Sequence, residues 1–137
     1  MERGDLAISV RPRVVVVLEG VLATFTPITR KRFRREHTTG FNISWHPTPL
    51  KRIATMKRMF PDVAIDVVTF VDGIVDDAAE FFNNAEIPVD SIEYHRFDKW
   101  VAVLPYQAEI QVIHDSDDTR LDQYGQLGRA TLLGGDL

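Results

Sequence analysis

Runs of apolar residues, separated by polar segments, predict the strands of a buried sheet. A continuous β-branched run, Arg13 to Leu18, predicts the first strand, and Val63 to Phe70 and Glu109 to Ile113 are mainly apolar and predict two further strands. Such runs are typical of parallel strands that are buried on both faces. Two shorter strands are expected, at Ile92 to Tyr94 and at Ala130 to Leu133.

Between these runs the apolar positions recur at helical spacing, which predicts four helices. They are expected from the capping residue Thr48 to Pro61, from 75 to 85, from Lys99 (capped by Asp98) to Pro105, and from 119 to 127. The inner face of the second helix is expected to carry Ala78, Phe81, Phe82 and Ala85. Alternating strands and helices predict an α/β fold. We expect a three-layer, Rossmann-like, mainly parallel sheet with helices on both faces.

The segment from about residue 23 to residue 46 interrupts this alternation. It combines aromatic residues with many cations, and Thr38-Thr39-Gly40 is expected to form a turn within it. We therefore predict a β-hairpin flap that projects from the sheet after the first strand. Trp45 in this segment and Trp100 farther along are expected to anchor the flap or the core.

Composition narrows the class of protein. The chain has 137 residues, 45% of them hydrophobic, which suits a single domain spanning residues 1–137 with its own core. It has no cysteine, so disulfides and thiolate metal sites are excluded. The net charge of −4 gives no general attraction to nucleic acid or to anionic membranes. No apolar run is long enough to span a bilayer and Met1 to Asp5 lack a secretion signal, so we expect a cytoplasmic protein.

The residues just after the strands carry a resemblance to a known family. Val14 to Leu22, which reads VVVVLEGVL, resembles the first motif of the haloacid-dehalogenase (HAD) superfamily, an apolar strand ending in Asp-x-Asp-Gly-(Val/Thr)-Leu. Val67-Val68-Thr69 resembles the second motif, Lys99 the third, and Val112 to Asp118 the fourth. The four occur in family order over nearly the whole chain. The sequence therefore resembles a HAD-like protein, in particular the small capless type of actinobacteria and their phages, with a degenerate first motif.

The resemblance implies a catalytic layout from which this chain departs. In the family, the first aspartate attacks phosphorus, the second acts as general acid and base, and the threonine and lysine hold phosphate oxygens. Here the nucleophile position aligns with Val17 and the acid/base position with Glu19, while Thr69 and Lys99 align with the phosphate-holding pair. Val17 has no nucleophilic atom, so the covalent route is closed. Glu19, Thr69 and Lys99 each also suit an ordinary structural role.

Acidic residues after the third long strand suggest a metal site or a helix cap. The resemblance implies that Asp115 helps to bind Mg²⁺, with Asp117 or Asp118 as a second acid (Asp118 is favoured) and Glu19 as a further oxygen ligand. Because Val17 supplies no ligand, we expect Mg²⁺ binding to be weak if it occurs, and no other cofactor. At least one of Asp115, Asp117 and Asp118 is expected to cap the following helix.

The densest charge feature is a basic stretch in the predicted flap. Five cations occur within six residues: Arg30, Lys31, Arg32, Arg34 and Arg35. One interpretation is a surface that binds phosphate, nucleic acid or an acidic partner. Another is a solvated hairpin whose charges keep its edges from pairing with other chains. A third is that these cations cover the former active site.

Three functions follow from these patterns. The leading hypothesis is a catalytically inactive HAD-like protein that binds a protein partner or a phosphorylated small molecule. The second is a divergent metal-dependent phosphatase or nucleotide hydrolase, in which Glu19 and Asp115 hold a metal that activates water. The third is nucleic-acid binding through the basic flap.

Overall fold

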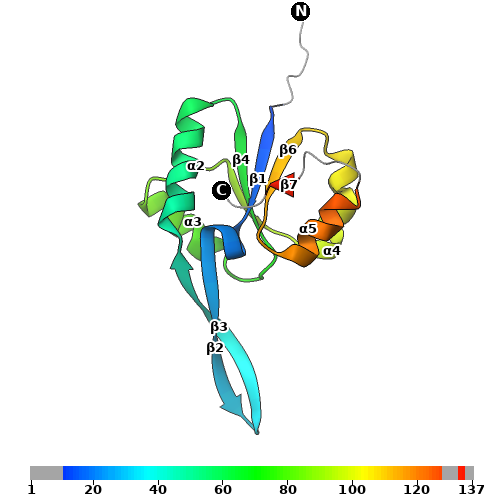
Figure 1. Cartoon of the computed structure of the whole chain (residues 1–137). Coiled ribbons are helices and arrows are strands. Elements are labelled where there is room, and N and C mark those ends of the chain that lie inside the picture. The colour runs from blue at the N-terminus through cyan, green and yellow to red at the C-terminus, as the bar shows by residue number, and fades with distance from the viewer. Residues whose placement is uncertain (1–10, 128–132, 135–137) are drawn as a thin grey trace, which may run out of the picture.

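A computed structural model describes residues 11–127 and 133–134 of the chain, and it contains a parallel sheet and a separate hairpin (Figure 1). The sheet has five strands in the order β5-β4-β1-β6-β7, and each neighbouring pair is parallel. The strands are β1 (Arg13–Val17), β4 (Ala64–Thr69), β5 (Ser91–Tyr94), β6 (Ile110–His114) and β7 (Leu133–Gly134). The three long strands lie within one residue of their predicted bounds. Residues 130–132 of the predicted last strand lie outside the described residues.

Four helices cover the two faces of this sheet, as predicted (Figure 1). They are α2 (Pro47–Met59), α3 (Val75–Asn84), α4 (Phe97–Val103) and α5 (Asp118–Gly125), and a short helical turn, Leu104–Tyr106, follows α4. In the central strand β1, Val16 packs with α2 and α3, whereas Val15 and Val17 pack with α4 and α5. Because side chains alternate between the faces of a strand, β1 contributes to both cores. The arrangement is a three-layer α/β fold.

The starts of two helices differ from the prediction. Thr48 does not cap α2, which begins at Pro47 with His46 as its N-cap residue. Proline suits the first helical position because its missing N–H would have no partner there. Asp98 does not cap α4 either: it lies in the first turn, after the N-cap residue Arg96.

The other helix ends show one capping side chain and one misplaced apolar residue. Asp117 caps α5, since its carboxylate accepts a hydrogen bond of 2.9 Å from the backbone N–H of Arg120, which confirms the predicted acidic cap. This helix ends at Gly125, before the predicted Leu127. In α3, Ala78 and Phe82 are buried as predicted, but Ala85 is the exposed C-cap residue because the helix has already ended at Asn84.

The predicted flap is an antiparallel hairpin of β2 (Ala23–Arg32) and β3 (Arg35–Trp45), but its turn lies elsewhere. Phe33 and Arg34 form the turn, with φ values of 52° and 64°. The segment expected to turn, Thr38-Thr39-Gly40, lies within β3, where Ile28 pairs with Gly40 and Thr29 with Thr38. Thr39 is therefore the extra residue of a β-bulge, and its hydroxyl donates to the carbonyl of Ile28 at 3.2 Å.

Aromatic residues anchor the base of the hairpin to the body. The ring of Trp45 stacks on Phe81 of α3 with centroids 3.9 Å apart, and it meets the edge of Phe82 at 5.5 Å. Trp100 lies in the opposite core, where its ring contacts Tyr124 at 5.9 Å. Both tryptophans are thus structural anchors, as expected. None of the described helices has the length and apolar composition that a bilayer crossing requires.

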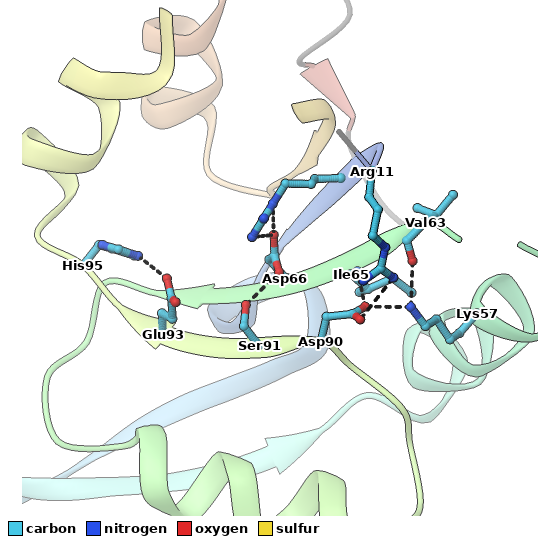
Figure 2. A network of polar contacts seen from close by, with 10 residues as sticks. Arg11, Lys57, Val63, Ile65, Asp66, Asp90, Ser91, Glu93 and His95 are labelled. Carbon is cyan, nitrogen blue, oxygen red and sulfur yellow. Dashed lines mark hydrogen bonds and ion pairs between the residues drawn. The ribbon is translucent and has the colours of Figure 1, made fainter. Parts of the chain in front are cut away.

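A polar network joins the amino end of β5 to its neighbours (Figure 2). The carboxylate of Asp90 accepts hydrogen bonds of 2.8 Å from Lys57 Nζ and 2.7 Å from the backbone N–H of Ile65. Burial disfavours the charged carboxylate, but these hydrogen bonds and the nearby cations outweigh it and lower the pKa of Asp90. The network therefore connects β5, β4 and α2 through one ionised side chain.

Candidate functional site

Three loops meet at the carboxyl ends of the central strands, where parallel α/β sheets bind their ligands. Val17 pairs with Val68 and Val16 with His114, so the residues that follow β1, β4 and β6 reach the same edge of the sheet. The turn after β1, Leu18–Leu22, contains Gly20 with a φ of 92°. A Cβ on Gly20 would lie 2.1 Å from Ser116 Oγ. Ser116 Oγ could rotate away, but the positive φ of this position strains any residue with a side chain, so the turn favours glycine.

Glu19 bridges two of these loops. Its Oε2 accepts a hydrogen bond of 2.9 Å from the backbone N–H of Phe70, just after β4. Its Oε1 is buried and has no hydrogen-bond partner among the described residues. The carboxylate therefore holds the turn after β1 to the end of β4 and leaves one acceptor oxygen free. Glu19, which aligns with the family's acid/base position, therefore has a structural role through its Oε2.

The other two aligned positions on the strands are buried. Thr69 is fully buried, and its hydroxyl oxygen accepts a hydrogen bond of 3.1 Å from the backbone N–H of Val71. Val17 is also fully buried, in the core that contains Trp100 and Tyr124. Its side chain offers neither a nucleophile nor a metal ligand at the strand end.

Asp115 is fully buried and has four hydrogen bonds to its carboxylate. Arg120 donates from Nε at 2.7 Å and from Nη2 at 2.9 Å, Tyr124 donates its hydroxyl at 2.7 Å, and the backbone N–H of Asp117 donates at 3.0 Å. The guanidinium also lies over the ring of Phe70, 5.2 Å from its centroid. The aligned fourth-motif acid is thus the centre of an ion-pair network, which we call the Asp115 cluster (Asp115, Arg120, Tyr124).

Ionisation in the Asp115 cluster follows from burial and pairing. Burial alone lowers the pKa of Arg120, but the hydrogen bonds and charge of Asp115 outweigh it and raise that pKa. Burial raises the pKa of Tyr124, and its hydrogen bond to Asp115 raises it further. The tyrosine hydroxyl therefore stays protonated and donates to the carboxylate. Sequence reasoning missed both partners. The one signal in the sequence was Arg120, a basic residue five positions after Asp115 in the predicted helix that follows the acids.

The residues at this edge do not suit Mg²⁺, which prefers several oxygen ligands in octahedral geometry. Both oxygens of Asp115 already bind the Arg120 cation, and Asp118 is exposed in the first turn of α5. The free Oε1 of Glu19 is one oxygen ligand. Nowhere in residues 11–127 and 133–134 do three His, Asp or Glu side chains gather in a way that suits a metal ion.

Lys99 lies on α4 and lines a cavity of about 400 Å³ between that helix and the sheet. The same cavity is lined by Arg13 and Glu109, at the amino ends of β1 and β6. No hydrogen bond or ion pair within the described part of the chain joins Lys99 to Glu19, Thr69 or Asp115. The structure thus brings Glu19, Thr69 and Asp115 to the same edge of the sheet. It places Lys99 apart from them, in the cavity between α4 and the sheet.

A second cavity, of about 510 Å³, lies between the hairpin and the loop after β4. Ile28, Phe41 and Ile43 of the hairpin form its apolar side, and Asp72 and Asp77 its acidic side. The five cations of the flap lie at the exposed tip of the hairpin, which points away from the body (Figure 1). They therefore do not cover the edge of the sheet that carries Glu19.

The fold and this edge define the class of the protein as a parallel α/β protein with a projecting hairpin. At the carboxyl ends of its strands lies a buried ion-pair network. We compared the chain with profiles of protein families, with curated proteins and with solved structures, and none of them matches it.

Proposed function

We propose that this chain is a Rossmann-like, HAD-like protein without the family's phosphatase chemistry, and that it acts by binding a protein partner. The single observation that carries the proposal is the Asp115 cluster. At the position where the family resemblance implies a magnesium ligand, Arg120 supplies the positive charge instead. Val17, buried at the aligned nucleophile position, supports the same conclusion.

The cost of separating Asp115 from Arg120 supports the view that Arg120 takes the place of a metal ion permanently. Asp115 is fully buried and the Arg120 side chain is 19% exposed. Removing one partner of such a pair costs roughly 3–5 kcal/mol, because the other charge is left buried and uncompensated. A magnesium ion would have to displace Arg120 from both oxygens of Asp115. Metal binding at this position is therefore opposed by the stability of the fold.

The negative charge of the cavity between the hairpin and the loop after β4 favours a protein partner over a phosphorylated ligand. Asp72 and Asp77 are exposed and line the cavity beneath the hairpin. A phosphate group would meet these negative charges without a metal ion to offset them. A partner with an exposed N–H group or a basic side chain has the complementary chemistry. A cytoplasmic location remains a prediction.

The proposal is tested by a phosphatase screen with Mg²⁺ on the natural protein and on Glu19→Gln prepared in parallel. We expect the same background rate from both proteins. Magnesium-dependent turnover by the natural protein that disappears in Glu19→Gln would disprove the proposal. The triple variant Val17→Asp, Glu19→Asp, Arg120→Ser restores the aligned aspartates and frees Asp115. Activity in this variant alone would support a HAD-like scaffold that has lost its chemistry.

The hydrolase hypothesis, in which Glu19 and Asp115 hold a metal, makes a separate prediction. It requires stoichiometric binding of Mg²⁺ or Mn²⁺, which calorimetry measures directly. We expect no saturable heat at millimolar metal, because Arg120 occupies Asp115. A one-to-one isotherm that is lost in Asp115→Asn would replace our proposal with this alternative.

A further inference from the structure

The tip of the hairpin gathers cations on one face. Arg30 lies directly opposite His37, and Arg32 directly opposite Arg35. Residues opposite each other in an antiparallel pair share a face, as do residues two apart on one strand. Arg30, Arg32, Arg35 and His37 therefore form one continuous surface, which we call the arginine face. Lys31 and its partner Glu36 lie on the other face.

This arrangement is unfavourable in the free protein. Like charges directly opposite each other destabilise a strand pair. Within the described part of the chain, none of the arginine-face guanidinium groups has an acidic partner, and residues 29–39 are exposed. A two-stranded ribbon in water is only marginally stable by itself, so cross-strand repulsion at its tip is costly. A polyanionic ligand would remove that repulsion.

The charge of the hairpin is opposite to that of the rest of the chain. Residues 23–45 contain five cations and one acid, whereas the whole chain has a net charge of −4. The hairpin extends away from the body, so its tip is separated from the acidic residues elsewhere (Figure 1). At physiological ionic strength, charge interactions are screened beyond about 8 Å. The tip can therefore attract a polyanion that the body would repel.

The shape of the tip distinguishes between nucleic acids. The major groove of B-form DNA admits a two-stranded β-ribbon, whereas the major groove of double-stranded RNA is too narrow for side chains to read. Phe33, at the turn, is 85% exposed, and the guanidinium of Arg32 lies 5.4 Å from the centre of its ring. An exposed aromatic side chain at the end of a cationic ribbon suits contact with bases in a groove that the ribbon enters.

From these observations we propose that the hairpin tip is a binding element for duplex DNA. The arginine face contacts backbone phosphates, and Phe33 enters the major groove. Such contacts position a protein on DNA without reading its sequence, so the binding is sequence-independent. This inference does not rest on the proposed function, because the arginine face shares no residue with the Asp115 cluster or with the acidic side of the cavity beneath the hairpin.

Fluorescence anisotropy of the full chain with a labelled 20-base-pair duplex, at several salt concentrations, tests the inference. The test variant is Arg30→Ala, Arg32→Ala, Arg35→Ala. The matched control, Lys51→Ala, Arg58→Ala, Arg96→Ala, removes three exposed cations from the body. Each phosphate contact contributes about 0.9 to the slope of log K against log salt. We expect the test variant to lose roughly three units of slope, and the control to keep the natural slope and affinity.

Other outcomes would overturn the inference. Unchanged affinity in the arginine-face variant, or an equal loss in the control, would exclude the tip as the contact surface. Tighter binding to the single strand, or binding only to vesicles that contain phosphatidylserine, would replace duplex DNA with another polyanion. Circular dichroism of both variants verifies folding. The test variant removes like charges from exposed positions, so we expect it to keep its fold.

Discussion

At the scale of single residues, the Asp115 cluster shows how one side chain can change what a site does. A fully buried carboxylate needs compensation, and Arg120 and Tyr124 supply it from the helix that follows. The same carboxylate with its oxygens free would be a ligand for a cation. Arg120 therefore converts an acidic position at a strand end into part of the core.

We expect Arg120→Met to lower the free energy of unfolding by about 3–5 kcal/mol, because Asp115 would remain buried without its cation. Tyr124→Phe removes a single hydrogen bond to the same carboxylate and should cost less, about 1.5–3 kcal/mol. Urea denaturation at neutral pH measures both losses. A cost below 1 kcal/mol for Arg120→Met, within the error of that method, would mean that Asp115 finds another partner.

A second residue-scale prediction concerns the hairpin turn. Phe33 and Arg34 adopt positive φ values, which favour asparagine and glycine in two-residue turns. We expect Phe33→Asn with Arg34→Gly to stabilise the hairpin by about 1 kcal/mol or more. Hydrogen exchange of the cross-strand amides measures this effect as slower exchange. Phe33→Ala is the control and should give no gain, since alanine retains the strain. Equal hydrogen-exchange protection in all three proteins would show that strain in the turn does not affect the stability of the hairpin.

At the scale of elements, the polar network around Asp90 illustrates how edge strands are attached (Figure 2). Strand β5 has only four residues and pairs on one side with β4. Asp90, immediately before it, binds the backbone of Ile65 and the side chain of Lys57. A short strand thus gains side-chain bonds to an adjacent strand and to a helix on one face.

This network predicts a pH dependence of stability. The pKa of Asp90 is lowered in the folded protein, so its contribution is complete above the usual aspartate value of about 3.9. That contribution is lost as the pH falls through the lowered pKa. We expect Asp90→Asn to cost about 1–3 kcal/mol at pH 7 and progressively less under acid conditions. Thermal melts from pH 7 to pH 2 measure the difference. Parallel curves for the two proteins would contradict this account.

At the scale of the whole molecule, the α/β body and the hairpin tip are separable. Three hairpin residues pack against the core on that side of the sheet, and all of them come from the part of the hairpin near its base: Phe25, Phe41 and Trp45. Residues 29–39 are exposed and belong to neither core. The body therefore owes its stability to the sheet and its helices, and the tip is available for another purpose.

We expect replacement of residues 29–39 by Asn-Gly, which joins the paired residues Ile28 and Gly40, to leave the melting temperature of the body unchanged. Duplex binding should be lost in the same protein. By contrast, Trp45→Ala removes the stacked contact with Phe81 and should destabilise the body by up to about 3–5 kcal/mol. Differential scanning calorimetry of both variants measures this contrast. A melting temperature that falls equally in both would show that the tip supports the body.

Prediction from the sequence succeeded where the signal is local and failed where a partner comes from another element. The mainly apolar segments located β1, β4 and β6, because strands in the middle of a sheet covered by helices on both faces are mostly apolar. The hairpin turn was misplaced because Thr39 and Gly40 suit a bulge as well as a turn. Only cross-strand register distinguishes the two, and it depends on contacts between distant residues.

The sequence by itself determined the order of strands and helices along the chain. That order follows from the residue types at each position. The tertiary structure alone decided which charges meet: it pairs Asp115 with Arg120 and, among the described residues, gives one oxygen of Glu19 no partner. It also collects the arginine face on one side of a ribbon. The physical reason is that apolar burial follows from local composition. The partner of a charge depends on where the folded chain places every other element.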